Sequence, residues 1–89
     1  MNIYLITYDL DNPGQNYSSL ISKIKGYPAW AHICESSWGI SAFDSAAEVR
    51  DNLVKVLDQN DKLFVGKLSG EAAWFGLSSD VTGWLHENL

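Results

Sequence analysis

The chain contains little that would stabilise a small protein outside the cell. Cys34 is its one cysteine in 89 residues, so no disulfide can form within the chain. Small secreted domains usually carry several disulfides, so we expect an intracellular, reducing compartment, the cytoplasm. A chain of this length buries only about 60% of its unfolded surface, which leaves a single domain over residues 1–89 with marginal stability. We therefore expect a homodimer, in which a second copy supplies further burial.

Basic residues and long apolar runs are also scarce. The N-terminus has no basic stretch before an apolar one, so no signal peptide is expected. No apolar run approaches the roughly 20 residues of a membrane span, so we expect no membrane partner. Six Lys and Arg stand against eleven Asp and Glu, a net charge of −5. Nucleic-acid binding usually leaves a basic patch, so this balance disfavours a nucleic-acid partner unless the basic residues gather on one face.

Apolar periodicity in the first half of the chain predicts a strand, a helix and two more strands. Residues 2–9 are largely apolar in both alternating sets, which indicates a central strand covered on both sides. Asn16 is a plausible N-cap and Gly26 a plausible C′ residue of a helix over 16–26, after an Asp-Asn-Pro-Gly turn. Aromatic and β-branched residues around a polar break then predict strands at 29–35 and 37–43.

The second half predicts a capped helix, a strand and a further strand and helix. Ser45 and Glu48 have capping-box spacing, and the helix they open carries one apolar face of Val49, Leu53, Val56 and Leu57. Residues 58–61 end it, and 62–68 form a strand. Residues 72–77 predict a short extra strand and 79–88 a short helix. The fold class expected is α+β, a ferredoxin-like βαββαβ with a C-terminal extra strand and short helix.

Asp9, at the end of the first strand, is the main candidate for chemistry. A strand that carries a carboxylate out of a core suits chemistry on a phosphate. The alternative is that Asp9 accepts hydrogen bonds from turn amides or caps the next helix. No lysine or arginine follows it before Lys23, so phosphate contacts from that stretch are expected to be weak.

Other polar and aromatic residues have structural interpretations beside functional ones. His32 and Cys34 lie two apart on a strand, which suits a metal pair or a thiol with a base, but buried packing is the preferred interpretation. Arg50 is expected to pair with Asp51 or Glu48 on a solvated face. His86 near a helix end is given no catalytic role. The four tryptophans suit either base stacking or packing in the core and the dimer interface, and packing is the preferred interpretation. They are Trp30, Trp38, Trp74 and Trp84.

Three segments carry a family resemblance: YDLDNPGQNYSSLISKIK, DSAAEVRDNL and KLSGEAAWFGL. With the order of the elements, they resemble small bacterial and phage proteins called the SinR family. These proteins are grouped in the superfamily of the second core CRISPR-associated protein, the small dimeric subunit of spacer acquisition. The virulence-associated protein D group, a related branch, is linked to RNA cleavage.

This resemblance implies a ferredoxin-like homodimer in prokaryotic or phage defence. Its C-terminal strand would cross to the partner, with a dimer interface at Trp74, Phe75 and Leu77. Asp9 would face its symmetry mate and act as a catalytic residue and Mg²⁺ ligand for phosphodiester cleavage. Asp11 would add an outer ligand, since Mg²⁺ prefers oxygen ligands and activates water for attack on a phosphate.

Three functions therefore stay open at this point. The first is a Mg²⁺-dependent nuclease with paired Asp9 side chains. The second is a non-catalytic interaction protein, an accessory or antitoxin-like dimer, which the acidic balance and aromatic content favour. The third is a dimeric RNA-binding module, whose affinity would fall steeply with salt.

Overall fold

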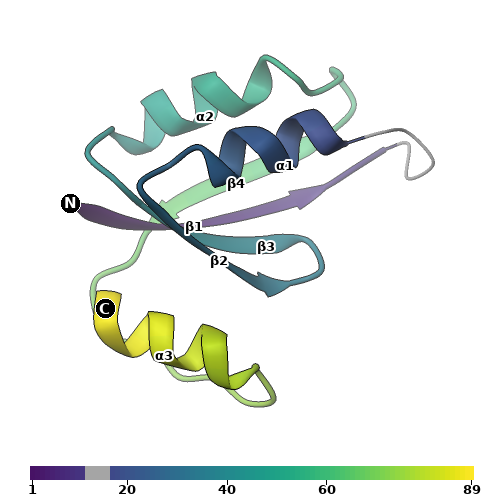
Figure 1. Cartoon of the computed structure of the whole chain (residues 1–89). Coiled ribbons are helices and arrows are strands. Elements are labelled where there is room, and N and C mark those ends of the chain that lie inside the picture. Colours follow the sequence, from purple (N-terminus) through teal and green to yellow (C-terminus); the bar gives the residue numbers. More distant parts are fainter. Residues whose placement is uncertain (12–16) are drawn as a thin grey trace.

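The computed structural model describes residues 1–11 and 17–89, which form an α+β protein (Figure 1). The predicted element order βαββαβ, with a helix after it, is confirmed. The elements are β1 (Asn2–Asp9), α1 (Ser18–Lys25), β2 (Ala29–Cys34), β3 (Ser37–Ala42), α2 (Ala46–Val54), β4 (Lys62–Lys67) and α3 (Ser79–Asn88).

The strands form one antiparallel sheet in the order β2-β3-β1-β4. β1 is central, as its apolar sequence predicts, and pairs with β3 on one side and β4 on the other. Helices α1 and α2 cover one face of this sheet, and α3 lies on the opposite side near β2 (Figure 1). The second face is therefore covered beside β2 and less so beside β1 and β4.

The core lies between the sheet and helices α1 and α2. Alternate residues of β1 and β3 point into it, because successive side chains of a strand face opposite sides. Its fully buried members are Tyr4, Ile6, Leu20, Ile24, Trp38, Ile40, Ala42, Val49 and Leu53. Val56 and Leu57 pack against this core although α2 ends at Val54, because turn hydrogen bonds carry the chain beyond the helix.

Helix α3 docks on the sheet where a glycine lets it approach. A Cβ atom at Gly39 in β3 would lie 2.8 Å from Cζ3 of the Trp84 ring, closer than real side chains come. A side chain at position 39 would therefore push α3 away from the sheet. Leu85, on the same helix, is buried, so α3 is a packed element of the fold.

The extra strand predicted at residues 72–77 is wrong for the single chain. That segment is irregular, and the Nε1–H of Trp74 donates a hydrogen bond to Thr82 Oγ1 at 3.1 Å. The Trp74 ring also lies 5.3 Å from that of His86. Gly76 has a φ of +81°, which interrupts an extended backbone. Trp74 thus folds back onto α3.

The ends of α1 also differ from prediction. Gly26 follows the helix with a φ of −77°, in the right-handed region, so it does not supply the left-handed cap expected of a C′ glycine. The predicted N-cap Asn16 lies outside the described residues, and the helix begins at Ser18.

The strand predicted at 62–68 is nearly complete, since the N–H of Leu68 still donates to the Ile3 carbonyl.

The capping box of α2 generates a stability prediction. Ser45 Oγ accepts the N–H of Glu48 at 3.1 Å, and Glu48 Oε1 accepts the N–H of Ser45 at 2.8 Å. Replacing Ser45 with Ala should lower the free energy of unfolding by about 1 kcal/mol, because the helix loses a cap. Urea denaturation measures this. Ser22→Ala, at an exposed position within α1, is the control, and equal losses in both variants would contradict the assigned cap.

Candidate functional site

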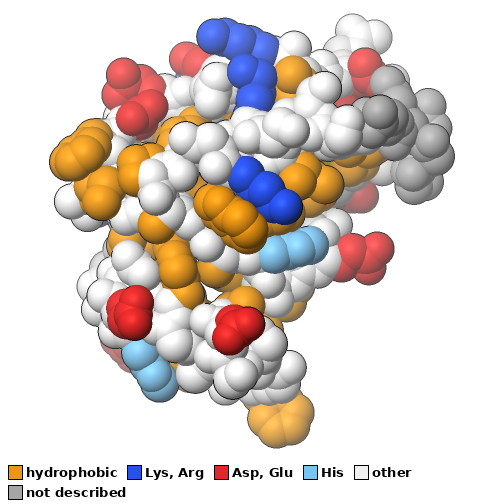
Figure 2. Space-filling model, in the orientation of Figure 1, with side chains coloured by type: hydrophobic (Ala, Val, Ile, Leu, Met, Phe, Trp, Pro, Cys, Tyr) orange, Lys and Arg blue, Asp and Glu red, His pale blue; other side chains and the backbone are white. Residues whose placement is uncertain are grey.

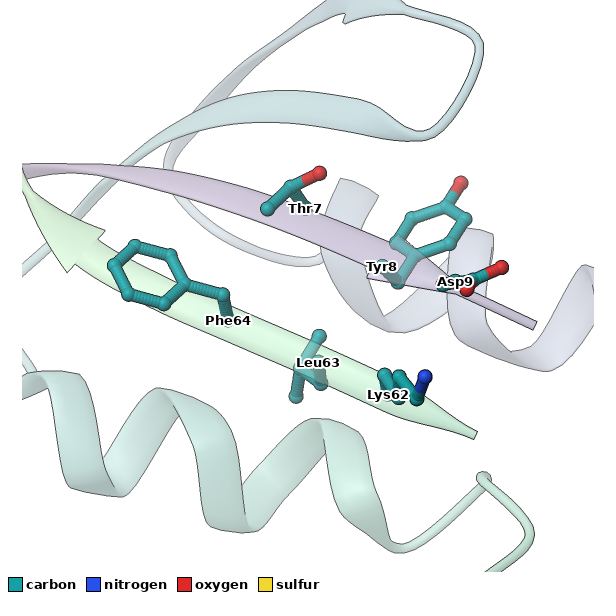
Figure 3. Close-up of a pocket in the computed structure, with 6 residues that line it drawn as sticks. All are labelled: Thr7, Tyr8, Asp9, Lys62, Leu63 and Phe64. Carbon is teal, nitrogen blue, oxygen red and sulfur yellow. The ribbon is translucent and has the colours of Figure 1, made fainter. Parts of the chain in front are cut away.

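Asp9 ends β1 at an exposed position and is directly opposite Lys62, the first residue of β4. Directly opposite residues of an antiparallel pair point to the same face of the sheet. Both side chains lie at the same end of the two strands (Figure 3). Sequence analysis did not connect these two residues, because only the strand register brings Lys62 across from Asp9.

A shallow hollow of about 230 Å³ surrounds this pair, and we call it the Asp9 hollow. It combines a carboxylate, an ammonium group, a hydroxyl and an aromatic ring. Phe64 on β4 is 59% exposed, so apolar surface is open to solvent here. The lining residues are those drawn in Figure 3, namely Thr7, Tyr8, Asp9, Lys62, Leu63 and Phe64.

The surroundings of the Asp9 carboxylate can be described for residues 1–11 and 17–89. Over residues 1–11 and 17–89, no hydrogen bond or ion pair joins it to another side chain or amide. The turn amides that Asp9 would accept from in its alternative role lie mostly at residues 12–16, outside the described residues, so that role stays a prediction. A second hollow, of about 320 Å³, also reaches Asp9 and is lined in part by Tyr17 and Glu35. Asp9 thus borders two solvent-filled depressions.

Asp61 performs the turn role that was considered for Asp9. Its Oδ1 accepts the N–H of Asp11 at 2.8 Å and the hydroxyl of Tyr17 at 3.3 Å, and its Oδ2 accepts the N–H of Asp58 at 2.8 Å. These bonds, led by that from Asp11, lower the pKa of Asp61 below its usual 3.8. Asp61 thereby ties the end of β1 to the loop that precedes β4.

Sequence analysis treated Asp61 only as part of the helix end. The local signal was present, because an aspartate three residues after Asp58 suits a side-chain bond back to the turn. The bond to Asp11, fifty residues away, had no local signal.

Asp11, the second predicted metal ligand, follows β1 at an exposed bend, where its backbone is held by Asp61. In the described part of the chain, no three His, Cys, Asp or Glu side chains gather closely enough to hold a metal ion. One described chain therefore does not assemble a closed metal cage from Asp9 and Asp11.

His32 and Cys34 are not the compact pair that their spacing suggests. A register shift falls between them in β2. The His32 ring stacks on Trp38 with centroids 4.0 Å apart, and its Nε2 lies 3.2 Å from the Glu35 carbonyl oxygen. The expectation of a buried Cys34 is wrong, since this thiol is exposed on a strand at the sheet edge.

The four tryptophans occupy different environments. Trp38 is a core residue, and its Nε1–H donates to the Tyr8 hydroxyl at 3.1 Å. Trp74 packs against α3, and Trp84 of α3 packs against the sheet at Gly39, which agrees with the packing interpretation. Trp30 is 40% exposed on β2, and Lys25 Nζ lies 4.9 Å from the centre of its ring.

Arg50 pairs with Asp51 at 2.9 Å, as predicted, and both side chains are more than half exposed. Exposed pairs of this kind contribute little to stability. His86 lies in the last turn of α3, the position expected for it.

No protein-family model matches this chain, and no solved structure matches it significantly. None of the helices in the described residues has the length and apolar character needed to cross a membrane.

The Asp61 bonds generate a pH prediction. A carboxyl whose folded pKa is depressed stabilises the fold above its unfolded pKa, and this contribution is lost as pH falls through the folded pKa. Asp61→Asn should therefore lower the urea midpoint at pH 7 and flatten its fall below about pH 4. Asp58→Asn is the control, because Asp58 takes part in this turn through its backbone N–H and carbonyl, which the substitution keeps. An unchanged midpoint for Asp61→Asn at pH 7 would contradict the assignment.

Proposed function

We propose that two copies of this chain form a ferredoxin-like homodimer that cleaves phosphodiester bonds in nucleic acid with the help of Mg²⁺. The ferredoxin-like assignment is supported by the order βαββαβ and the sheet order β2-β3-β1-β4, with α1 and α2 on one face. Prokaryotic or phage defence in the cytoplasm is proposed as the setting on the family resemblance alone.

The exposed Asp9 carboxylate opposite Lys62, with no bonding partner among the described residues, is the observation that carries this proposal. An exposed carboxylate beside a cation at a strand end offers an oxygen ligand for a metal and a positive charge for a phosphate group. Lys62 also supplies the basic residue that is missing from the stretch after Asp9. The neighbouring Phe64 ring, more than half exposed, offers a surface on which a base can stack.

The residues fit Mg²⁺ only if two copies contribute. This ion prefers oxygen ligands and keeps several waters, so one Asp9 from each copy is enough beside a substrate phosphate, with Asp11 as an outer ligand. When bound, the metal would polarise a phosphoryl oxygen and activate water. Lys62 would position the nucleic-acid strand, and the dimer would hold the two Asp9 carboxylates at its axis.

The dimer interface is proposed on the C-terminal segment and the less covered part of the sheet. Phe75 is 99% exposed, and Leu77 is partly exposed beside it. Trp74 would keep its contact with α3 and form part of the interface beside that helix. Phe64 adds apolar surface on β4. Covering such side chains with a second copy would remove apolar area from water.

Nuclease activity is tested with Asp9→Asn. Wild-type protein should cleave single-stranded RNA or DNA in Mg²⁺, and Asp9→Asn should reduce cleavage to background because the metal loses its ligands. Asp58→Asn, an exposed aspartate outside the Asp9 hollow, is the matched control and should retain activity. Equal cleavage by wild type and Asp9→Asn would exclude Asp9 as the catalytic residue.

Light scattering on the same samples measures the oligomeric state, which distinguishes a loss of catalysis from a loss of the dimer. Asp9→Asn should remain a dimer, whereas Phe75→Asp should be monomeric and inactive. Phe43→Asp, at an exposed aromatic residue outside the interface, should behave as wild type. A wild-type monomer at all concentrations would contradict the paired Asp9 site.

A non-catalytic interaction dimer is the second candidate. It is favoured by the net charge of −5 and by the C-terminal residues 68–89, which contain Glu71, Asp80 and Glu87 but no lysine or arginine. An acidic surface of this kind suits a basic protein partner.

A further inference from the structure

Three exposed side chains gather beside the edge strand β2, on the face of the sheet that carries α1. In the register of β2 with β3, Trp30 lies opposite Ile40. His32 lies opposite Trp38 in the same register. Both partners on β3 are core residues, and directly opposite residues point to the same face, so both rings lie on the α1 side. Lys25, the last residue of α1, reaches these rings. We call Lys25, Trp30 and His32 the edge platform.

The His32 ring has one side against the core and the other toward solvent. Its inner side stacks on Trp38, with ring centroids 4.0 Å apart and an interplanar angle of 5°. Its Nε2 lies 3.2 Å from the Glu35 carbonyl oxygen, which can only accept, so Nε2–H is the donor that fixes the ring. His32 is exposed, and among the described strands none lies beyond β2. The outer side of the ring is therefore open to a further planar group.

Lys25 is held by an aromatic ring and not by an acid. Its Nζ lies 4.9 Å from the centre of the Trp30 ring and 6.0 Å from that of Trp38. Over residues 1–11 and 17–89, Lys25 forms no ion pair with a carboxylate. A cation–π contact does not use all three N–H donors of an ammonium group. Lys25 can therefore bind an anion while it rests against Trp30.

Charge has a direction along the edge platform. Lys25 lies at its Trp30 end, whereas the exposed Glu35 follows at its His32 end. Figure 2 shows this order near the middle of the molecule, where a blue side chain lies beside an orange area, followed by a pale blue side chain and a red one. An anionic group bound here would therefore lie at the Lys25 end, away from the Glu35 carboxylate.

We propose that the edge platform binds single-stranded nucleic acid, with one base stacked on the outer side of His32 and a neighbouring phosphate on Lys25. Stacking of this kind accepts any base, because every base has a π face. Trp30, which is 40% exposed, would hold Lys25 in place and add apolar contact. The edge platform lies on the face of the sheet opposite to Asp9 and shares no residue with the Asp9 hollow. This inference therefore does not depend on the metal site.

Charge and shape favour a single strand over other occupants. A duplex keeps its bases inside, whereas an unpaired base is free to stack on an aromatic side chain. A free nucleotide is usually bound in a concave pocket that buries most of its surface, but the edge platform is an open sheet edge. A basic peptide would be repelled by Lys25. The net charge of −5 opposes the binding of phosphates, so we expect modest affinity that falls with salt.

The test is NMR titration of the full chain at low salt with a short single-stranded DNA of mixed sequence and the RNA of the same sequence. EDTA keeps Mg²⁺ out, so the result is separate from any cleavage at Asp9. The ring resonances of His32 and the indole N–H of Trp30 should shift most. An abasic strand of the same length should bind about tenfold more weakly, because it offers phosphates without a base to stack.

Variants then measure what each side chain contributes. His32→Ala and Lys25→Ala should each weaken binding about tenfold. Lys25→Ala should also reduce the slope of log affinity against log salt by about one, because one phosphate contact is lost. His32→Phe keeps a ring and should retain binding. Phe43→Ala and Lys55→Ala, at exposed positions on other elements, are the matched controls and should bind as wild type does.

The amide spectrum of each variant verifies that the fold is intact. Glu35→Gln should bind more tightly, because it removes the carboxylate at the far end of the edge platform. Three results would overturn the proposal: no shift at His32 or Trp30 with either strand, equal binding of the abasic strand, or binding that survives in both His32→Ala and Lys25→Ala.

Discussion

The register of β1 between β3 and β4 is the constraint on which the rest of the structure depends. With Leu5 opposite Gly39 and Gly66, the side chains of Tyr4 and Ile6 enter the core, while Asp9 emerges at the other face. A slip of one residue would exchange the two faces of the strand. Buried Tyr4 reinforces this register, because its hydroxyl donates to the Asp44 carbonyl at 2.6 Å.

Unequal cover of the sheet follows from that arrangement and shapes the proposed site. Helices α1 and α2 close one face, whereas α3 reaches the other face only where Gly39 admits Trp84. The Asp9 hollow therefore opens beside β1 and β4, away from α3.

Local patterns in the sequence predicted the elements well, because period-two and helical apolar spacing report directly on burial. The cap at Ser45 was also predictable, since its partner Glu48 is three residues away. The conformation of residues 72–77 was not predictable, because the hydrogen bond from Trp74 to Thr82 depends on how α3 folds back. The exposure of Cys34 was missed for a similar reason, since only the sheet order makes β2 an edge.

Only part of the candidate site could be predicted from the sequence. Asp9 is identifiable from its place at the end of an apolar strand. Lys62 becomes its neighbour only through strand register, and Asp61 acquires its role only when Asp11 comes beside it. Contacts between residues fifty or more positions apart carry no local pattern, so sequence analysis considered a turn role for Asp9 and none for Asp61.

Manganese titration followed by NMR tests the central claim most directly. Mn²⁺ substitutes for Mg²⁺ at oxygen sites and broadens nearby resonances. The amides of Tyr8, Asp9 and Lys62 should broaden first in the wild-type dimer and remain sharp in Asp9→Asn. Broadening that is absent, that begins elsewhere, or that persists in Asp9→Asn would contradict a metal site at this strand end.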